Sequence, residues 1–179
     1  MRSAASELED FDAVVQLHRS RVFRFALASL RDRDAAETLT QDCFLRAYRA
    51  RDRFRGDSSL TTWLMQIAVN LVRDQVRNRR LQFWKRTQSS AVDLELASER
   101  ILDRDSSPEA RALANEQLRA VWSATERLPG RQRTVFLLRF VEDMDLLEIA
   151  AATGMKEGTV KVHLFRALQA VRAQIGSRV

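Results

Sequence analysis

Apolar residues recur at intervals of three and four along most of the chain, which is the spacing that places them on one face of an α-helix. Val22, Phe25 and Ala26 show it in the first such segment. Only 5 Gly and 2 Pro occur among 179 residues, so few helix-breaking positions interrupt the pattern. The sequence therefore predicts an all-α protein. The expected helices cover residues 8–31, 34–54, 60–80, 108–128, 131–141, 145–153 and 157–175.

The pattern weakens over residues 87–107. Acidic residues outnumber basic ones there, aromatic residues are absent, and the stretch ends in Ser-Ser-Pro. Such a composition is typical of a linker. The Ser107-Pro108-Glu109 sequence that follows is a good helix start. We therefore expect two small helical domains, residues 8–86 and 108–177, joined by an acidic linker over residues 87–107 that DNA would repel.

The charge balance indicates a polyanionic partner. Thirty Lys and Arg against 24 Asp and Glu give a formal net charge of +6, and the sequence pI is about 10.5. Almost all the basic residues are Arg, whose guanidinium group suits phosphates and base edges. The chain's partner is therefore expected to be a nucleic acid.

Other classes of protein find little support. The lone Cys43 is expected to be a small buried hydrophobe. His18 and His163 are far apart, acidic residues are scattered, and no phosphate-binding glycine loop occurs, so we expect no enzyme, metal or cofactor. A nuclease or recombinase and a basic membrane-surface protein remain the weaker alternatives. No signal peptide and no apolar run of about 20 residues is evident, which predicts a cytoplasmic protein without membrane insertion.

The last two predicted helices meet at a tight corner. Gly154 lies where a helix commonly ends in a left-handed residue, and the small Ala150 allows the two helices to cross closely. The outward face of the second helix is polar and basic, as expected of a helix in a DNA major groove. The sequence therefore predicts a helix-turn-helix in the C-terminal domain. Its candidate DNA contacts are Lys156, Thr159, Lys161, His163, Phe165 and Arg166.

The sequence GTVKVHLFRAL in this helix resembles two families: bacterial sigma factors of the extracytoplasmic-function (ECF) group and response regulators of the LuxR/NarL type. The second family implies an α/β receiver or a ligand-binding domain upstream. The alternating, glycine-punctuated strands of a receiver are absent from this chain. The rest of the chain therefore favours the ECF group.

A second resemblance lies in FRGDSSLTTWLMQIAVN, residues 54–70, which is similar to the ECF segment that recognises and melts the −10-type promoter element. A polar loop before an Arg-rich helix also suits single-stranded DNA. Ser58 or Ser59 is expected to cap that helix. Trp63 is expected either in the core or at the melted strand. The resemblance implies promoter contacts from Phe54, Arg55, Gly56, Asp57, Ser58, Ser59, Trp63, Asn70, Asp74, Arg77 and Arg80.

Residues 34–54 resemble the ECF segment that docks on the clamp helices of the RNA polymerase β′ subunit. Asp34 and Glu37 have the spacing of a capping box, so we expect the helix to open at Asp34. Family members typically carry an acidic residue where this chain has Thr38. The resemblance implies a docking surface of Glu37, Gln41, Asp42, Leu45 and Arg46.

Together these resemblances imply an ECF sigma factor, a dissociable subunit that directs bacterial RNA polymerase to promoters. The implied partners are core polymerase, through β′ and β, promoter DNA and an anti-sigma factor. ECF members often have Ser where Lys156 stands, and Ser and a basic residue at the positions of Val162 and His163, so base preference cannot be copied from relatives. The linker either threads near the polymerase active centre or is a plain spacer.

Overall fold

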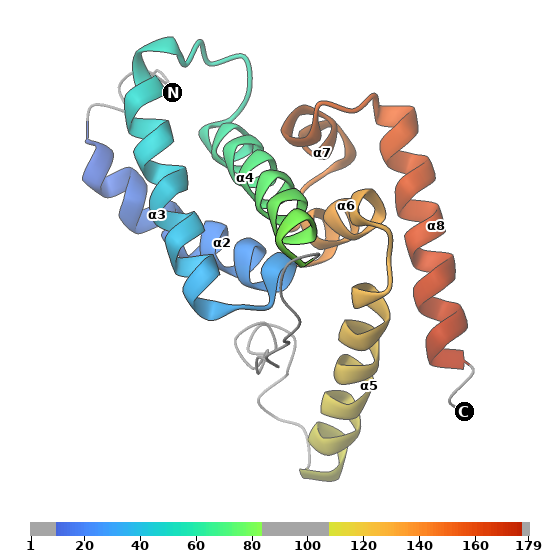
Figure 1. Cartoon of the computed structure of the whole chain (residues 1–179). Helices are drawn as coiled ribbons and strands as arrows, with labels where there is room; N and C mark the ends of the chain where they lie inside the picture. Colours follow the sequence, from blue (N-terminus) through green and yellow to red (C-terminus); the bar gives the residue numbers. More distant parts are fainter. Residues whose placement is uncertain (1–9, 84–107, 177–179) are drawn as a thin grey trace.

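The computed structural model describes residues 10–83 and 108–176, with side chains over residues 10–79 and 115–176, and every regular element in these ranges is helical (Figure 1). The predicted all-α class is confirmed. The linker and the outermost residues of both predicted domains lie outside the described ranges. The elements are α2 (Phe11–Leu30), α3 (Arg33–Ala50), the 3₁₀ turn η1 (Arg51–Arg53), α4 (Leu60–Phe83), α5 (Pro108–Glu126), α6 (Gly130–Phe140), α7 (Leu146–Thr153) and α8 (Glu157–Gly176).

The start of α3 differs from the prediction. The helix is capped by Asp32, whose backbone is extended and whose carboxylate accepts a hydrogen bond from the Ala35 N–H at 2.9 Å. Asp34 lies inside the first turn, and Glu37 pairs with Arg19 of α2 at 2.7 Å. The predicted capping box was wrong because Asp32 reaches the orphan N–H groups first and Glu37 has a tertiary partner.

Helix α4 is buried over a wider arc than one stripe. Leu64, Ala68 and Leu71 share one face, and Met65 and Val69 on the neighbouring face are buried as well. A surface helix normally needs only one apolar stripe, roughly 100° wide. The wider arc has a structural reason, since α4 packs against both α2 and α3 and also against α7.

The helices before and after the linker pack on each other. Helix α7 lies against α4, and α6 lies against α2 (Figure 1). One buried cluster contains residues from both halves, including Leu64 of α4, Leu137 of α6 and Ile149 of α7. A second cluster belongs to the C-terminal half alone, where α5 and α8 run side by side. The two halves therefore share a core in this conformation.

Charged residues lie at the junction between the halves. Glu142, just after α6, is 1% exposed, and its Oε2 atom is 3.1 Å from both Arg21 Nε and Arg24 Nη2 of α2. Arg21 also donates to the Glu142 backbone carbonyl. Arg133 of α6 donates to the Ala28 carbonyl at 2.6 Å. These contacts link residues more than 100 positions apart, so only the folded chain creates them.

The Glu142 carboxyl should make stability depend on pH. Burial raises its pKa from 4.5 to about 7, although Arg24 and Arg21 act in the opposite direction. The folded state therefore holds a proton that the unfolded state has released between these pH values. Its contribution to stability is present below about pH 4.5 and is lost as the pH rises through about 7. We expect a decrease in unfolding free energy on the order of 1–3 kcal/mol between pH 5 and pH 8.

Urea denaturation of the full chain at several pH values measures this effect. Glu142→Gln provides the matched control, because the amide keeps the shape but does not titrate. The difference between the two proteins isolates Glu142 from other titrating groups. Equal pH slopes in the two proteins would contradict the prediction.

Candidate nucleic-acid interface and docking surface

The helix-turn-helix has the predicted boundaries. Asp145 caps α7, accepting from the Glu148 N–H at 2.8 Å, while the Glu148 carboxylate accepts from the Asp145 N–H at 2.9 Å. This reciprocal capping box fixes where α7 begins. Gly154 ends the helix with φ of 69°, a left-handed conformation that glycine adopts without a steric penalty. The corner therefore has the sequence signals that its geometry needs.

Helix α8 is anchored by its apolar stripe. Val160, Ala167 and Val171 are buried against α5, α6 and α7. The opposite face is open: Phe165 is 61% exposed, and Arg166 is also exposed. This face has the mixed basic and apolar character suited to a major groove.

The other predicted DNA contacts of the helix-turn-helix differ in their exposure and in their bonding partners. Lys156 and Thr159 are exposed. Lys161 is exposed and pairs with Glu157 one turn earlier, at 2.6 Å. His163 is half-buried, and its Nδ1 atom is buried without a hydrogen-bond partner. His163 is therefore the least accessible of the predicted −35 residues.

Val162 belongs to the outward face that the sequence predicts for this helix, although it is not among the candidate contacts, and it is 47% exposed on α8. An exposed valine on a basic helix could contact a thymine methyl group. Its position between Lys161 and His163 was the available signal.

The predicted base-capturing loop connects η1 to α4. Gly56 has φ of 75°, which favours glycine at this turn, and Arg55 and Asp57 are exposed. Ser59 caps α4: its hydroxyl accepts from the Thr62 N–H at 3.1 Å. Of the two serines predicted as caps, Ser59 is therefore the one that serves, and the half-buried Ser58 does not.

An aromatic pair supports one end of this loop. Phe54 and Trp63 are half-buried, with ring centroids 4.9 Å apart, and both pack against the main core. Trp63 is thus in contact with the core and still partly open to solvent. Both roles considered for it remain compatible with this position.

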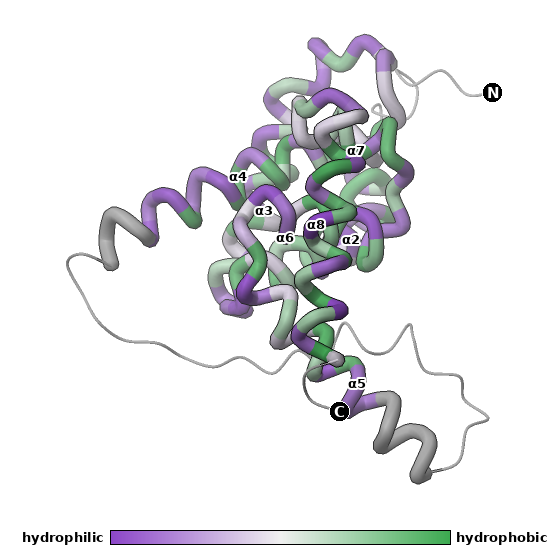
Figure 2. Tube along the Cα trace, turned by 90° about the vertical axis from the view of Figure 1, so that its right-hand side faces the viewer, coloured by the Kyte–Doolittle hydropathy of each residue, from purple (hydrophilic) through white to green (hydrophobic). Residues whose placement is uncertain are grey.

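The polar face of α4 continues from this loop. Asn70 is half-buried and accepts a hydrogen bond from Arg73 at 2.9 Å. Asp74 is also half-buried and lies 3.7 Å from the exposed Arg77. The predicted contact Arg80 lies outside the residues whose side chains are described. Hydrophilic residues predominate along this part of α4, which extends away from the body of the molecule (Figure 2).

Arg79 lies on α4 between the predicted contacts Arg77 and Arg80, and it forms an ion pair with a residue from another part of the chain. Arg79 pairs with Asp32 at 2.6 Å and also donates to the Leu30 carbonyl at 3.4 Å. It ties the second half of α4 to the turn between α2 and α3. Arg79 therefore helps to fix the position of this part of α4.

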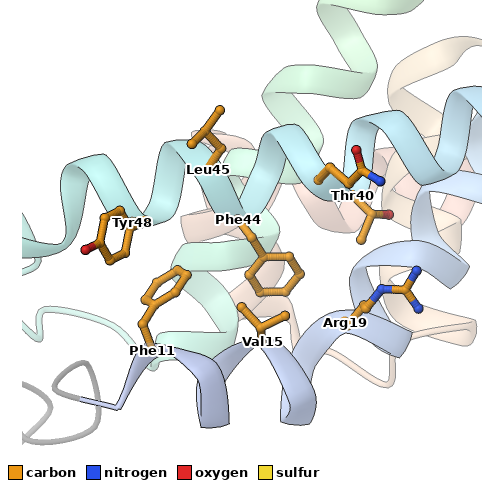
Figure 3. A pocket seen from close by; sticks show the side chains of 8 residues that line it. Phe11, Val15, Arg19, Thr40, Phe44, Leu45 and Tyr48 are labelled. Atoms are coloured by element: carbon orange, nitrogen blue, oxygen red, sulfur yellow. The ribbon is translucent and has the colours of Figure 1, made fainter.

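The predicted docking residues border an apolar groove between α2 and α3. The groove has a volume of about 340 Å³. Phe11 and Val15 of α2 face Phe44 and Tyr48 of α3 across it (Figure 3). The rings of Phe11 and Tyr48 meet edge to face, with centroids 5.2 Å apart. Sequence reasoning missed this groove because Phe11 and Val15 read as ordinary core positions.

The charged and polar candidates surround the groove. Gln41 and Leu45 line it, and Leu45 is 47% exposed. Asp42 and Arg46 are exposed one position further along α3. The structure brings four of the five predicted docking residues together as an accessible surface, while Glu37 is partly engaged by Arg19.

Among the described residues, none of the helices has the length and apolar character that a membrane span requires.

Comparison with known proteins agrees with this arrangement. Residues 14–82 match the family described as Sigma-70 region 2, and residues 118–171 match Sigma-70, region 4. The first segment contains nearly all of α4 and the predicted docking residues of α3, and the second contains α7 and most of α8. Both segments occur in the order expected from the sequence.

Similar full-length proteins carry sigma-factor names. The RNA polymerase sigma-H factor of Pseudomonas aeruginosa is 31% identical over 90% of this chain and 83% of its own length. The ECF RNA polymerase sigma-E factor of Escherichia coli is 36% identical over 74% of this chain and 70% of its own. The ECF sigma factor SigW of Bacillus subtilis is 26% identical over 92% and 88%, respectively.

Solved structures share the fold. The sigma factor RpoE of Bartonella quintana, solved with the anti-sigma factor NepR, matches with a TM-score of 0.72 and 23% identity, covering 94% of this chain and 98% of that one. CnrH, solved with the cytosolic domain of CnrY, matches with a TM-score of 0.66 and 22% identity, covering 98% and 94%. Two matched sigma regions in order, and relatives above 30% identity over most of both chains, lead to one conclusion: the protein belongs to the ECF sigma factors of bacterial RNA polymerase.

Proposed function

We propose a division of labour in which the α2–α3 surface docks on the polymerase, the loop before α4 captures a base of the −10-type element, and α8 reads the −35-type element. The observation that carries this proposal is the placement of three distinct accessible surfaces on two matched sigma regions. Because the two DNA-binding surfaces belong to one chain, two contacts of moderate affinity can together bind a promoter strongly. Adding the purified chain to core polymerase and sequencing the 5′ ends of run-off transcripts tests it.

Docking combines the apolar groove with the charges beside it. Phe11, Val15 and Tyr48 offer apolar contact area, and Asp42 and Arg46 add charges that fix orientation. Apolar pockets flanked by a polar rim are typical of interfaces that exclude water at their centre. The partner is proposed to be the clamp helices of β′, with further contacts to the β subunit.

Strand opening is assigned to residues 54–59 and the polar face of α4. Pulling one base from the stack costs a few kcal/mol, so a loop that binds that base gives melting a specific starting point. Arg77 supplies positive charge for the strand, and the half-buried Asn70 offers hydrogen bonds. Trp63 is positioned to contribute a partly exposed aromatic edge.

Arg166→Ala should weaken binding to the −35-type duplex by roughly 1–3 kcal/mol if the exposed guanidinium reads a base. The loss should be concentrated at one base-pair position, because a phosphate contact would weaken all sequences alike. Fluorescence anisotropy with the cognate element and single base-pair variants measures both quantities. Arg119→Ala, an exposed arginine of α5, is the matched control. Unchanged selectivity would remove Arg166 from base readout.

The protein is proposed to act in the cytoplasm under the control of an anti-sigma factor. Control by an anti-sigma factor is supported by the structural neighbour RpoE, which was solved with the anti-sigma factor NepR; CnrH was solved with the cytosolic domain of CnrY. The apolar groove and the exposed face of α8 are both accessible to such a partner. To test this proposal, the tagged chain is purified together with the protein that binds it. Transcription by core polymerase should then increase once that protein is removed.

A further inference from the structure

The outward face of α8 has an apolar centre. Val162 follows the buried Val160 by two residues, which places it about 200° around the helix and so nearly opposite the core. Val162 is 47% exposed, and Phe165, three residues further on, is 61% exposed. Residues three apart are neighbours on the surface of a helix. The two side chains therefore form an apolar patch in the middle of this face.

The polar side chains next to Val162 in the sequence are turned elsewhere. Lys161 pairs with Glu157 at 2.6 Å, which holds its ammonium group toward the first turn of α8. His163 is half-buried, and its Nδ1 atom is buried. The side chain of Val162 has no hydrogen-bond donor or acceptor. Whatever this part of the helix recognises, Val162 must recognise it by apolar contact.

The surrounding charges indicate what covers the patch. Exposed apolar residues can mark a site for another protein or for a ligand. Here the helix-turn-helix also carries three exposed basic residues, Lys156, Arg166 and Arg172. Positive charge around an apolar patch favours a partner that is polyanionic and yet presents an apolar group. The major groove of DNA meets both conditions.

The apolar group that the major groove presents is the C5-methyl group of thymine. Val162 and Phe165 are separated by about 4.5 Å along the helix axis, at about 1.5 Å per residue. Successive base pairs are about 3.4 Å apart. Because these spacings are similar, the two side chains can reach the same base pair or adjacent ones. Arg166 lies beside Val162 on the same face and can donate to a guanine nearby.

We propose that Val162 is a specificity-determining residue that contacts the methyl group of a thymine in the upstream promoter element, with Phe165 on the same or the next base pair. The inference rests on the proposed assignment of α8 to the −35-type element. It adds the identity of the base that the centre of the helix recognises. Contact with a methyl group selects thymine over cytosine and uracil without any hydrogen bond.

Replacing thymidine by deoxyuridine removes only the methyl group and keeps the O4 acceptor and the base pairing. Promoters come from sequencing the transcript starts, and each thymidine of the upstream element is replaced singly on either strand. The holoenzyme of the full chain and core polymerase is then titrated with each duplex. We expect binding to weaken about threefold to fivefold at one or two positions, the size expected for one buried methyl group. Replacements outside the promoter elements should have no effect.

Val162→Ala links the lost contact to this residue. In this variant, deoxyuridine at the sensitive position should weaken binding by less than about 1.5-fold, because the two changes remove the same contact. Leu17→Ala is the matched control, since it also truncates an exposed apolar side chain but lies on α2. Its holoenzyme should show the full effect of deoxyuridine. Both positions are exposed, so both variants should keep the helical circular dichroism of the wild type.

Methylated cytosine tests the same contact in the opposite direction. With a cytosine–guanine pair at the sensitive position, 5-methylcytosine should bind the wild-type holoenzyme about threefold more tightly than cytosine does. Val162→Ala should not distinguish the two bases. Equal binding of both duplexes by the wild-type holoenzyme would contradict a methyl contact.

The proposal is overturned if no thymidine of the element is sensitive to loss of its methyl group. It is also overturned if deoxyuridine weakens binding equally in Val162→Ala and the wild type, because another residue would then make the contact. A patch that serves a protein partner would leave promoter binding of Val162→Ala unchanged. Each of these failures is separate from failure of the proposed function, in which Arg166→Ala would leave selectivity unchanged as well.

Discussion

Asp42→Arg should weaken binding to core RNA polymerase on the order of a hundredfold while leaving the fold intact. Asp42 is exposed on α3 beside the apolar groove, so the substitution changes the docking surface without disturbing the core. Docking would place the new positive charge where the proposed surface offers a negative one. Loss of a buried interfacial charge pair costs roughly 2–5 kcal/mol. We therefore expect affinity to fall on the order of a hundredfold, at about 1.4 kcal/mol per factor of ten.

The measurement is a titration of labelled protein with core polymerase at two salt concentrations. Glu116→Arg is the matched control, because it makes the same charge change on an exposed position of α5. The control should bind like the wild type, apart from a small salt-dependent difference. Wild-type affinity in Asp42→Arg would remove this part of α3 from the docking surface.

Removing Asp57 and Ser58 should strongly reduce promoter opening while sparing recognition of the upstream duplex. This deletion retains Gly56, whose left-handed backbone turns the chain, and Ser59, whose hydroxyl caps α4. It shortens only the segment proposed to hold the unstacked base. Loss of a few kcal/mol of base capture should reduce open complex by roughly a hundredfold.

Permanganate reactivity of unpaired thymines reports the open complex, and mobility shift with the −35-type duplex reports upstream binding. An Asp52→Ala and Arg53→Ala variant, altered in the exposed turn η1 just before the loop, is the control. Asn70→Ala is expected to act in the same direction, with a smaller effect. Full permanganate reactivity after the deletion would exclude a role for this loop in melting.

Most of the helical framework could be predicted from local sequence. Periodic apolar residues located the helices, and Gly154 marked the end of α7. The exposed face of α8 was predictable too, because helical periodicity places Phe165 and Arg166 opposite the buried Val160. These features depend on residues within a few turns of one another, which is the range over which sequence patterns carry information.

Features that depend on distant residues escaped prediction. Asp32 took the capping position expected for Asp34, and Glu37 turned to Arg19. The docking groove needs α2 and α3 side by side. The burial of α4 on a second face was not predicted, although Met65 and Val69 are apolar, because its partner helix α7 lies far along the chain.

The sequence by itself determined an all-α chain, the two sigma regions with their motifs in order, and the basic character that favours DNA. Only the tertiary structure decided that the halves share a core and that Glu142, an acidic residue after α6, is buried between Arg21 and Arg24 of α2. The physical reason is the range of the forces involved. Helix periodicity and capping act within a few residues, whereas burial of a charge depends on which surfaces meet after the chain has folded.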